Sequence, residues 1–85
     1  MFIVEEWMGG VLRGYDILAN PGEAFVEACR AFGRVINGRG KIRVVDHERI
    51  EIPHSSSRAF LELGKNVGIV QDGSENEVWI RPRAV

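Results

Sequence analysis

The first eighteen residues have an apolar pattern that fits two kinds of element. Apolar side chains recur at helical spacing from Val4 to Leu18, which is typical of a helix with one buried face. Gly9, Gly10 and Gly14 interrupt that helix, and each glycine destabilises a helix by about 1 kcal/mol relative to alanine. We therefore favour two strands joined at Gly9-Gly10, with one weak helix as the alternative.

A helix is predicted from about Pro21 to Ile36. Asn20 precedes it as the N-cap, and Glu23 follows the cap by three residues, as in a capping box that has proline at the first helical position. The Asn37-Gly38 pair supplies the left-handed residue that ends the helix. The predicted buried stripe consists of Phe25, Ala28, Cys29, Phe32, Val35 and Ile36.

After Gly40 the apolar period changes to two, which is typical of strands. Lys41–Val44 and Arg49–Ile52 alternate between polar and apolar residues, and the short stretch between them suits a tight hairpin. Pro53 ends the second of these strands because it lacks a backbone donor. The hydroxyls of Ser55–Ser57 are predicted to cap a short helix from about Ser57 to Leu63, which ends at Gly64.

Two further strands complete the predicted fold. Val67–Gln71 and Glu77–Arg81 enclose a polar turn that contains Asp72-Gly73. The order of elements predicts the α+β class, with a small, mostly antiparallel sheet, one main helix and one short helix. A chain of 85 residues and 9.5 kDa has room for one core, so we expect a single domain over residues 1–85.

Composition excludes several classes of protein. Apolar residues make up 45% of the chain and charged residues 27%, interleaved as in globular domains. The longest apolar runs have three or four residues, far below the roughly 18 that a membrane span needs, and we identify no leader peptide. Cys29 is the single cysteine. Its place on the helix stripe predicts a buried, inert thiol, and the lack of a disulfide partner predicts a cytoplasmic protein.

The charges are unevenly distributed, although they sum to −1. Residues 1–33 contain five acids and two bases, whereas residues 34–85 contain seven acids and nine bases. Between residues 34 and 45 there is no acid, and the bases are Arg34, Arg39, Lys41 and Arg43. This local density suits contact with a phosphate backbone. It is equally typical of a solvated strand edge that is protected against aggregation.

Residues with catalytic or metal-binding chemistry are present but do not form a recognisable site. Asp46–Glu48 and Ser55–Ser57 contain the residue types of a serine triad, yet no Gly-x-Ser-x-Gly elbow exposes a serine. His47 and His54 lie seven residues apart, with no cysteine near them and no His-x-x-x-His helix, so a zinc site with three ligands is not expected. The Gly38–Lys41 segment follows a helix and precedes a strand, the reverse of a phosphate-binding loop. We therefore predict no enzymatic activity, no metal and no cofactor.

Trp79 is a candidate contact residue. It alternates with Val78 and Ile80 in the last predicted strand, so its side chain points to the opposite face of the sheet. If nothing covers that face within one subunit, an exposed tryptophan marks an interface.

The second half of the chain resembles a family of DNA-binding domains. The shared pattern has an aspartate, an arginine that opens a strand, alternation to a proline, an arginine in a short helix, and a last strand with an Asn-Glu-apolar-Trp sequence. The matching residues are Asp46, Arg49, Ile50, Ile52, Pro53, Arg58, Leu63, Lys65, Val67, Asn76, Glu77 and Trp79. This pattern is similar to the swapped-hairpin domain of the SpoVT/AbrB class, most of all to its MraZ form. Glu48 stands where the family has glycine.

The resemblance implies a homodimer whose hairpins interleave into a small barrel that contacts DNA. It assigns Arg49 and Arg58 to the DNA contacts, and charge adds further candidates for phosphate contacts. These candidates are Arg39, Lys41 and Arg43. We therefore predict a small, dimeric, non-enzymatic DNA-binding transcriptional regulator. The alternative is a protein-binding or self-assembling accessory module, such as an antitoxin or a mobile-element product, that uses Trp79 as its contact residue and does not bind DNA.

Overall fold

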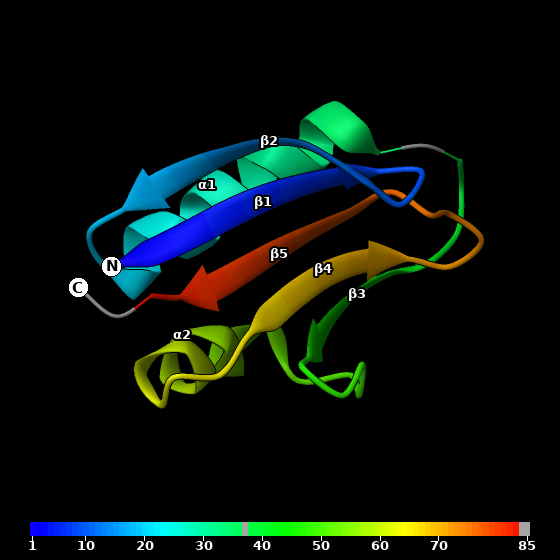
Figure 1. The fold of residues 1–85 in the computed structure, drawn as a ribbon. Helices are drawn as coiled ribbons and strands as arrows, with labels where there is room; N and C mark the ends of the chain where they lie inside the picture. The colour runs from blue at the N-terminus through cyan, green and yellow to red at the C-terminus, as the bar shows by residue number, and fades with distance from the viewer. Residues whose placement is uncertain (37, 84–85) are drawn as a thin grey trace.

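One antiparallel sheet of five strands organises the computed structural model, which describes residues 1–36 and 38–83 (Figure 1). The strands are β1 (Phe2–Met8), β2 (Val11–Leu18), β3 (Ile42–Asp46), β4 (Val67–Gln71) and β5 (Glu77–Pro82). The helices are α1 (Pro21–Val35) and α2 (Ser57–Glu62), and the 3-10 turn η1 (His54–Ser56) leads into α2. The order in the sheet is β2-β1-β5-β4-β3. The predicted α+β class and antiparallel sheet are therefore confirmed.

The predicted hairpin at the start of the chain is also confirmed. Strands β1 and β2 pair through a turn in which Gly9 and Gly10 have φ values of 59° and 78°. Residues other than glycine rarely adopt such values, and two-residue hairpin turns of this type require both. The register shifts by one residue between Glu6 and Trp7, so a β-bulge lies near the turn.

Helix α1 begins as predicted but buries a different face. The Oδ1 atom of Asn20 accepts a hydrogen bond from the Glu23 amide at 2.8 Å, which confirms the N-cap. The buried residues are Ala24, Ala28, Ala31, Phe32 and Val35. The predicted burial of Cys29 and Ile36 is wrong, because both are exposed. The helix uses its alanines as well as its larger residues against the sheet, which rotates the buried stripe away from Cys29.

The end of α1 also differs from the prediction. The helix stops at Val35 because Ile36 adopts an extended conformation, with ψ at 135°. Gly38 does adopt the left-handed conformation, with φ at 90°, but it lies beyond the helix end. Asn37 lies outside the described residues.

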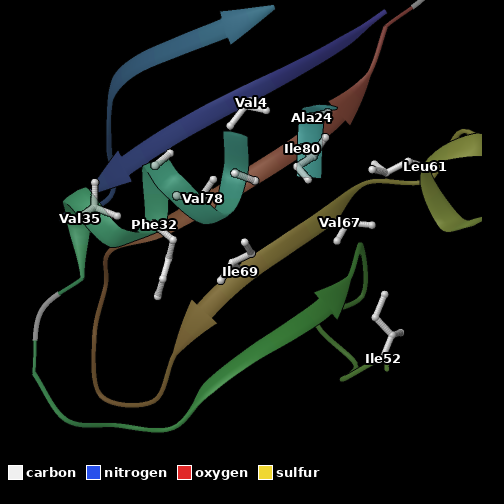
Figure 2. Packing of buried hydrophobic residues seen from close by; sticks show 12 residues of the cluster. Val4, Ala24, Phe32, Val35, Ile52, Leu61, Val67, Ile69, Val78 and Ile80 are labelled. Atoms are coloured by element: carbon white, nitrogen blue, oxygen red, sulfur yellow. The ribbon is translucent and has the colours of Figure 1, made fainter. Parts of the chain in front are cut away.

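The core lies between α1, α2 and one face of the sheet (Figure 2). Ala24 and Ala28 have no exposed surface, and their small side chains let α1 pack close to β1 and β5. Val4, Val78 and Ile80 point from those two strands toward the helix. Leu61 brings α2 into the same cluster, so both helices lie on one side of the sheet.

The segment after β3 corrects two predictions. Arg49–Ile52 is not a regular strand, and it meets β3 through a single bridge between Glu51 and Val45. The reason is that Arg49, with a φ of 64°, belongs to the turn, and only Ile50–Ile52 then runs beside β3 before Pro53. The predicted serine cap of α2 is also wrong, since Ser57 Oγ instead donates to the carbonyl of His54 at 2.9 Å.

Asn76 joins three parts of the fold that are distant in the sequence. Its Oδ1 atom accepts a hydrogen bond from the Gly9 amide at 3.1 Å in the β1–β2 turn. Its Nδ2 atom donates to the carbonyl of Val35 at 2.8 Å, which satisfies a group at the C-terminus of α1. The turn between β4 and β5 is thereby tied both to α1 and to the first hairpin.

Replacing Asn76 tests this connection. Asn76→Ala removes two tertiary hydrogen bonds, one of them partly buried, so we expect the free energy of unfolding in urea to fall by about 1 to 3 kcal/mol. Glu75→Ala, in the same turn and exposed, is the control and should change stability by no more than about 0.5 kcal/mol. Equal effects of the two substitutions would contradict the role given to Asn76.

Candidate interaction surface

One face of the sheet has no helix over it in the part of the chain that the structure describes. We call this the open face, and its residues point away from α1 because they alternate with the core residues. They include Ile3, Glu5 and Trp7 of β1, Tyr15 and Ile17 of β2, Arg43 and Val45 of β3, Val70 of β4, and Glu77, Trp79 and Arg81 of β5. Tyr15 is 62% exposed and Ile17 is 46% exposed. The open face therefore presents apolar surface together with charge.

Two Glu-x-Trp sequences meet at the centre of the open face. In the β1–β5 ladder Glu5 lies opposite Trp79, and Trp7 lies opposite Glu77. Each indole donates its N–H to the glutamate two residues before it, at 3.0 Å for Trp7 and 2.9 Å for Trp79. Because the strands are antiparallel, the two motifs form a crossed square of two carboxylates and two indoles.

Two arginines complete this cluster. Arg81 Nε donates to Glu5 Oε1 at 2.7 Å, and Arg49 donates from both terminal nitrogens to the two oxygens of Glu77, each at 2.8 Å. Both guanidinium groups also lie over the Trp79 ring, with their central carbons 5.6 Å and 5.5 Å from its centroid. The arginines thus stack on the indole and neutralise the carboxylates at the same time.

Trp79 lies on the face that its alternation predicts, but it is only 7% exposed. Its ring lies across Gly68 of β4, where an added Cβ would come within 2.7 Å of the indole. Arg49 and Arg81 lie over the ring as well. The predicted contact role of Trp79 is therefore indirect in this structure, because a partner would meet the arginines that the indole supports.

A cleft opens beside the cluster. It has a volume of about 390 Å³, and its lining residues are Trp7, Gly10, His47, Arg49, Asn66, Glu77, Trp79 and Arg81. These residues come from β1, β5, the β1–β2 turn and the loops on either side of α2. The open-face cleft is the place where both ends of the chain and its middle converge.

Arg49 is held in the cleft by an unusual backbone conformation. It is the only described residue other than glycine with a positive φ, a conformation that is unfavourable for a side chain with a Cβ. Asp46 stabilises the turn, because its Oδ1 atom accepts hydrogen bonds from the amides of Glu48 at 2.8 Å and Ile50 at 3.0 Å. Strained residues of this kind are concentrated at functional sites.

The five predicted DNA contacts do not share one surface. Arg39 and Lys41 are exposed at the start of β3, Arg43 and Arg49 lie on the open face, and Arg58 lies on α2. Four of them have carboxylate partners within the chain: Lys41 lies 4.0 Å from Glu51, Arg43 pairs with Asp72 and Glu51, Arg49 with Glu77, and Arg58 with Glu62. The Arg43 hydrogen bond also lowers the pKa of Asp72. Their charges are therefore largely balanced before any ligand arrives.

The candidate catalytic residues bond to nearby backbone groups or to a neighbouring side chain. Asp46 accepts two backbone hydrogen bonds, and His47 lies 3.4 Å from the Glu48 carboxylate on the surface. Ser57 donates to a backbone carbonyl.

The exposed Cys29 lines a small apolar crevice of about 150 Å³, with Phe25 and His54 among its neighbours. Partial burial raises the pKa of the Cys29 thiol, which makes the thiolate less available.

Sequence analysis missed the acidic half of the cluster and Arg81. Arg81 and Glu5 are 76 residues apart, and Arg49 and Glu77 are 28 residues apart, so no local pattern reveals either pair. The detectable signal was the repetition of Glu-x-Trp in the first and last strands. This repetition indicates a cluster only once the β1–β5 register is known, because the register places the two motifs opposite each other.

Among residues 1–36 and 38–83, no helix is long and apolar enough to cross a membrane. In the same residues no group of three or more His, Cys, Asp or Glu side chains is placed to hold a metal ion. No protein-family model, curated protein or solved structure matches the chain.

The Glu77 carboxylate gives the cluster a testable pH dependence. Burial raises its pKa, but hydrogen bonds from Arg49 and Trp79 and the charge of Arg49 outweigh burial and hold the pKa below the ordinary value of 4.5. A carboxyl group with a lowered pKa stabilises the folded state above its ordinary pKa, and this contribution is lost as the pH falls through the folded-state value.

Glu77→Gln should therefore be less stable than the unmodified chain in urea at about pH 7, and the difference should shrink at about pH 3. Glu75→Gln, at an exposed position in the turn before β5, controls for the loss of one negative charge. A Glu77→Gln deficit that stays constant over this range would show that the ionised pair contributes nothing specific.

Proposed function

We propose that the chain is a non-enzymatic protein-binding module and that the open-face cleft receives a segment of its partner. The observation that carries this proposal is the Glu5–Trp7–Glu77–Trp79 square with its two arginines on a sheet face that no helix covers. Arginine and tryptophan are the residues most enriched among those that dominate the energy of protein interfaces. Exposed Tyr15 and Ile17 extend the same face with apolar area.

The chemistry of the cleft indicates what the partner segment carries. Glu5 engages Arg81 through Nε, and within the described part of the chain the two terminal nitrogens of Arg81 have no hydrogen-bond partner. Trp7 lines the same cleft and donates its indole N–H to the same Glu5 oxygen as Arg81 Nε. A carboxylate beside an aromatic or aliphatic side chain would satisfy both groups. Glu5 also holds Arg81 in place before binding, which reduces the entropy cost of association.

Charge favours a polypeptide over a nucleic acid at this face. Arg43, Arg49 and Arg81 contribute three positive charges. Their four carboxylate partners are Glu5, Glu51, Asp72 and Glu77. A phosphate backbone would bring a row of negative charges against these carboxylates, whereas a peptide brings a single carboxylate to the terminal nitrogens of Arg81. A duplex would also release few counterions from arginines that are already paired. The swapped-hairpin DNA-binding regulator nevertheless stays a prediction, with Arg39 and Lys41 as its exposed cations, and the same experiment tests it.

The test is selection from a random library of 12-residue peptides displayed on phage, followed by fluorescence anisotropy with synthetic copies of the enriched peptides. We expect peptides with an acidic residue close to an aromatic or aliphatic one. Arg81→Ala and Trp7→Ala should weaken their binding at least about tenfold. Arg58→Ala, which removes an arginine from α2 on the other side of the sheet, is the control and should leave the affinity unchanged.

A labelled duplex DNA pool titrated at several salt concentrations distinguishes the two functions. The proposal predicts no duplex binding at about 50 mM salt. Tight duplex binding that weakens steeply with salt, and that is lost in Arg39→Ala or Lys41→Ala, would replace the protein-binding proposal with the DNA-binding one. If neither Arg81→Ala nor Trp7→Ala changes the affinity for the enriched peptides, the assignment of the cleft as the binding site is contradicted.

A further inference from the structure

A narrow apolar crevice lies on the helix side of the sheet, opposite the open face. It has a volume of about 150 Å³, and it lies where α1, the β3–β4 pair and the turn η1 meet. We call it the β3 crevice. Its lining residues are Phe25, Cys29 and Phe32 of α1, Ile42 and Val44 of β3, Ile69 of β4, and His54 of η1.

The position of α1 on the sheet explains the crevice. The helix packs mainly on β1 and β5, so the β3 end of the sheet is covered only by side chains from the margin of the helix and by η1. Phe32 and Ile69 are 5% and 4% exposed and belong to the core (Figure 2), so they form the inner end. Cys29, Ile42 and His54 are exposed and form the mouth.

The size and lining of the β3 crevice determine what it can hold. Apolar cavities of about 150 Å³ that are lined by leucine, isoleucine and phenylalanine bind single-ring molecules such as benzene. The β3 crevice has this volume, and two phenylalanines, two isoleucines and a valine line it. Phe25 and His54 pack edge to face, with ring centroids 4.7 Å apart and planes at 71°, an arrangement that a further aromatic ring can extend.

The hydrogen-bonding side chains of the β3 crevice lie at its mouth. Of the lining residues, only Cys29 and His54 have side chains that can form hydrogen bonds. A thiol is a weak donor and acceptor, whereas an imidazole has one strong donor and one strong acceptor when neutral. A ligand that fits this pattern places an apolar ring inside and one polar group outward, within reach of His54.

We infer that the β3 crevice binds a free small molecule with one aromatic ring and one hydroxyl group, that is, a simple phenol. A free molecule fits better than a side chain of a partner protein, because 150 Å³ accommodates the ring and its hydroxyl group but not a peptide backbone as well. This site goes beyond the proposed protein binding and does not depend on it, since it lies on the other face of the sheet from the open-face cleft.

Titration of the ¹⁵N-labelled full chain with p-cresol, followed by NMR, tests the site. We expect saturable shifts of the Cys29 and Ile69 amide signals, with a dissociation constant of about 1 mM or lower. The indole signal of Trp79 on the open face should not move. On the unmodified chain, p-cresol should also slow the reaction of the Cys29 thiol with an aromatic disulfide reagent, because the bound ring lies beside the thiol.

Substitution of Cys29 tests the location. Cys29→Phe places a ring in the β3 crevice from an exposed position of α1, so the dissociation constant of p-cresol should rise at least about tenfold. Val26→Phe makes the same kind of change on α1 at a residue that is 51% exposed and does not line the crevice, and it should leave the dissociation constant unchanged. Circular dichroism of both variants shows whether the fold is retained.

Substitution of His54 tests the role of the hydroxyl group. His54→Leu keeps an apolar wall and removes the hydrogen bond, so it should weaken p-cresol about fivefold more than toluene, which has no hydroxyl group. Equal effects on the two molecules would contradict the assignment of a phenol.

Three results would overturn the site itself. They are the lack of saturable shifts up to about 20 mM p-cresol, well above the expected dissociation constant, undiminished binding to Cys29→Phe, and an unchanged rate of thiol labelling. Shifts centred on Trp79 would instead assign the ring to the open-face cleft. Cys29→Phe should still bind the peptides selected for the open face, so failure of one site is distinguishable from failure of the other.

Discussion

The pairing of β1 with β5 is the interaction on which the rest of the structure depends. It joins the first hairpin to the β3-β4-β5 part of the sheet, and the two strands are the first and last of the chain. On the inner face it brings Val4 beside Ile80 under α1. On the outer face it sets Glu5 against Trp79 and Trp7 against Glu77. A register slip of one residue would exchange these faces and expose the core residues, so the core and the cluster specify the same pairing.

The open face combines exposure with order. A small domain with helices on only one face of its sheet exposes the other face to water. Here paired charges and stacked arginines cover the central indole of that face. An individual salt bridge between side chains as exposed as these contributes little to the stability of the fold. In this cluster each carboxylate is shared between an arginine and an indole N–H, and this network of salt bridges fixes the positions of the arginine side chains. This ordering holds in place side chains that would otherwise be flexible.

Local signals in the sequence predicted local structure well. The Asn20 cap, the Gly9-Gly10 turn and the polar Asp72-Gly73 turn after Val67–Gln71 each identified an element that the structure contains. The predicted strand Arg49–Ile52 was wrong because alternation cannot reveal the left-handed conformation of Arg49. The pairing of the arginines could not be predicted for a different reason. Their carboxylate partners lie in distant strands, and only the order of strands in the sheet brings them together. Charge density along the sequence therefore overstated the free positive charge of this chain.

Amide hydrogen exchange measured by NMR tests the central claim most directly. If β1–β5 pairing holds the two parts of the sheet together, the amides of Glu5 and Trp79, which belong to a hydrogen-bonded pair of this ladder, should exchange only through global unfolding, as slowly as those of β4. Nuclear Overhauser contacts should also link Glu5 with Trp79 across the ladder. Fast exchange throughout β1 and β2, with slow exchange confined to β4 and α1, would contradict the account, because the first hairpin would then open independently of the rest.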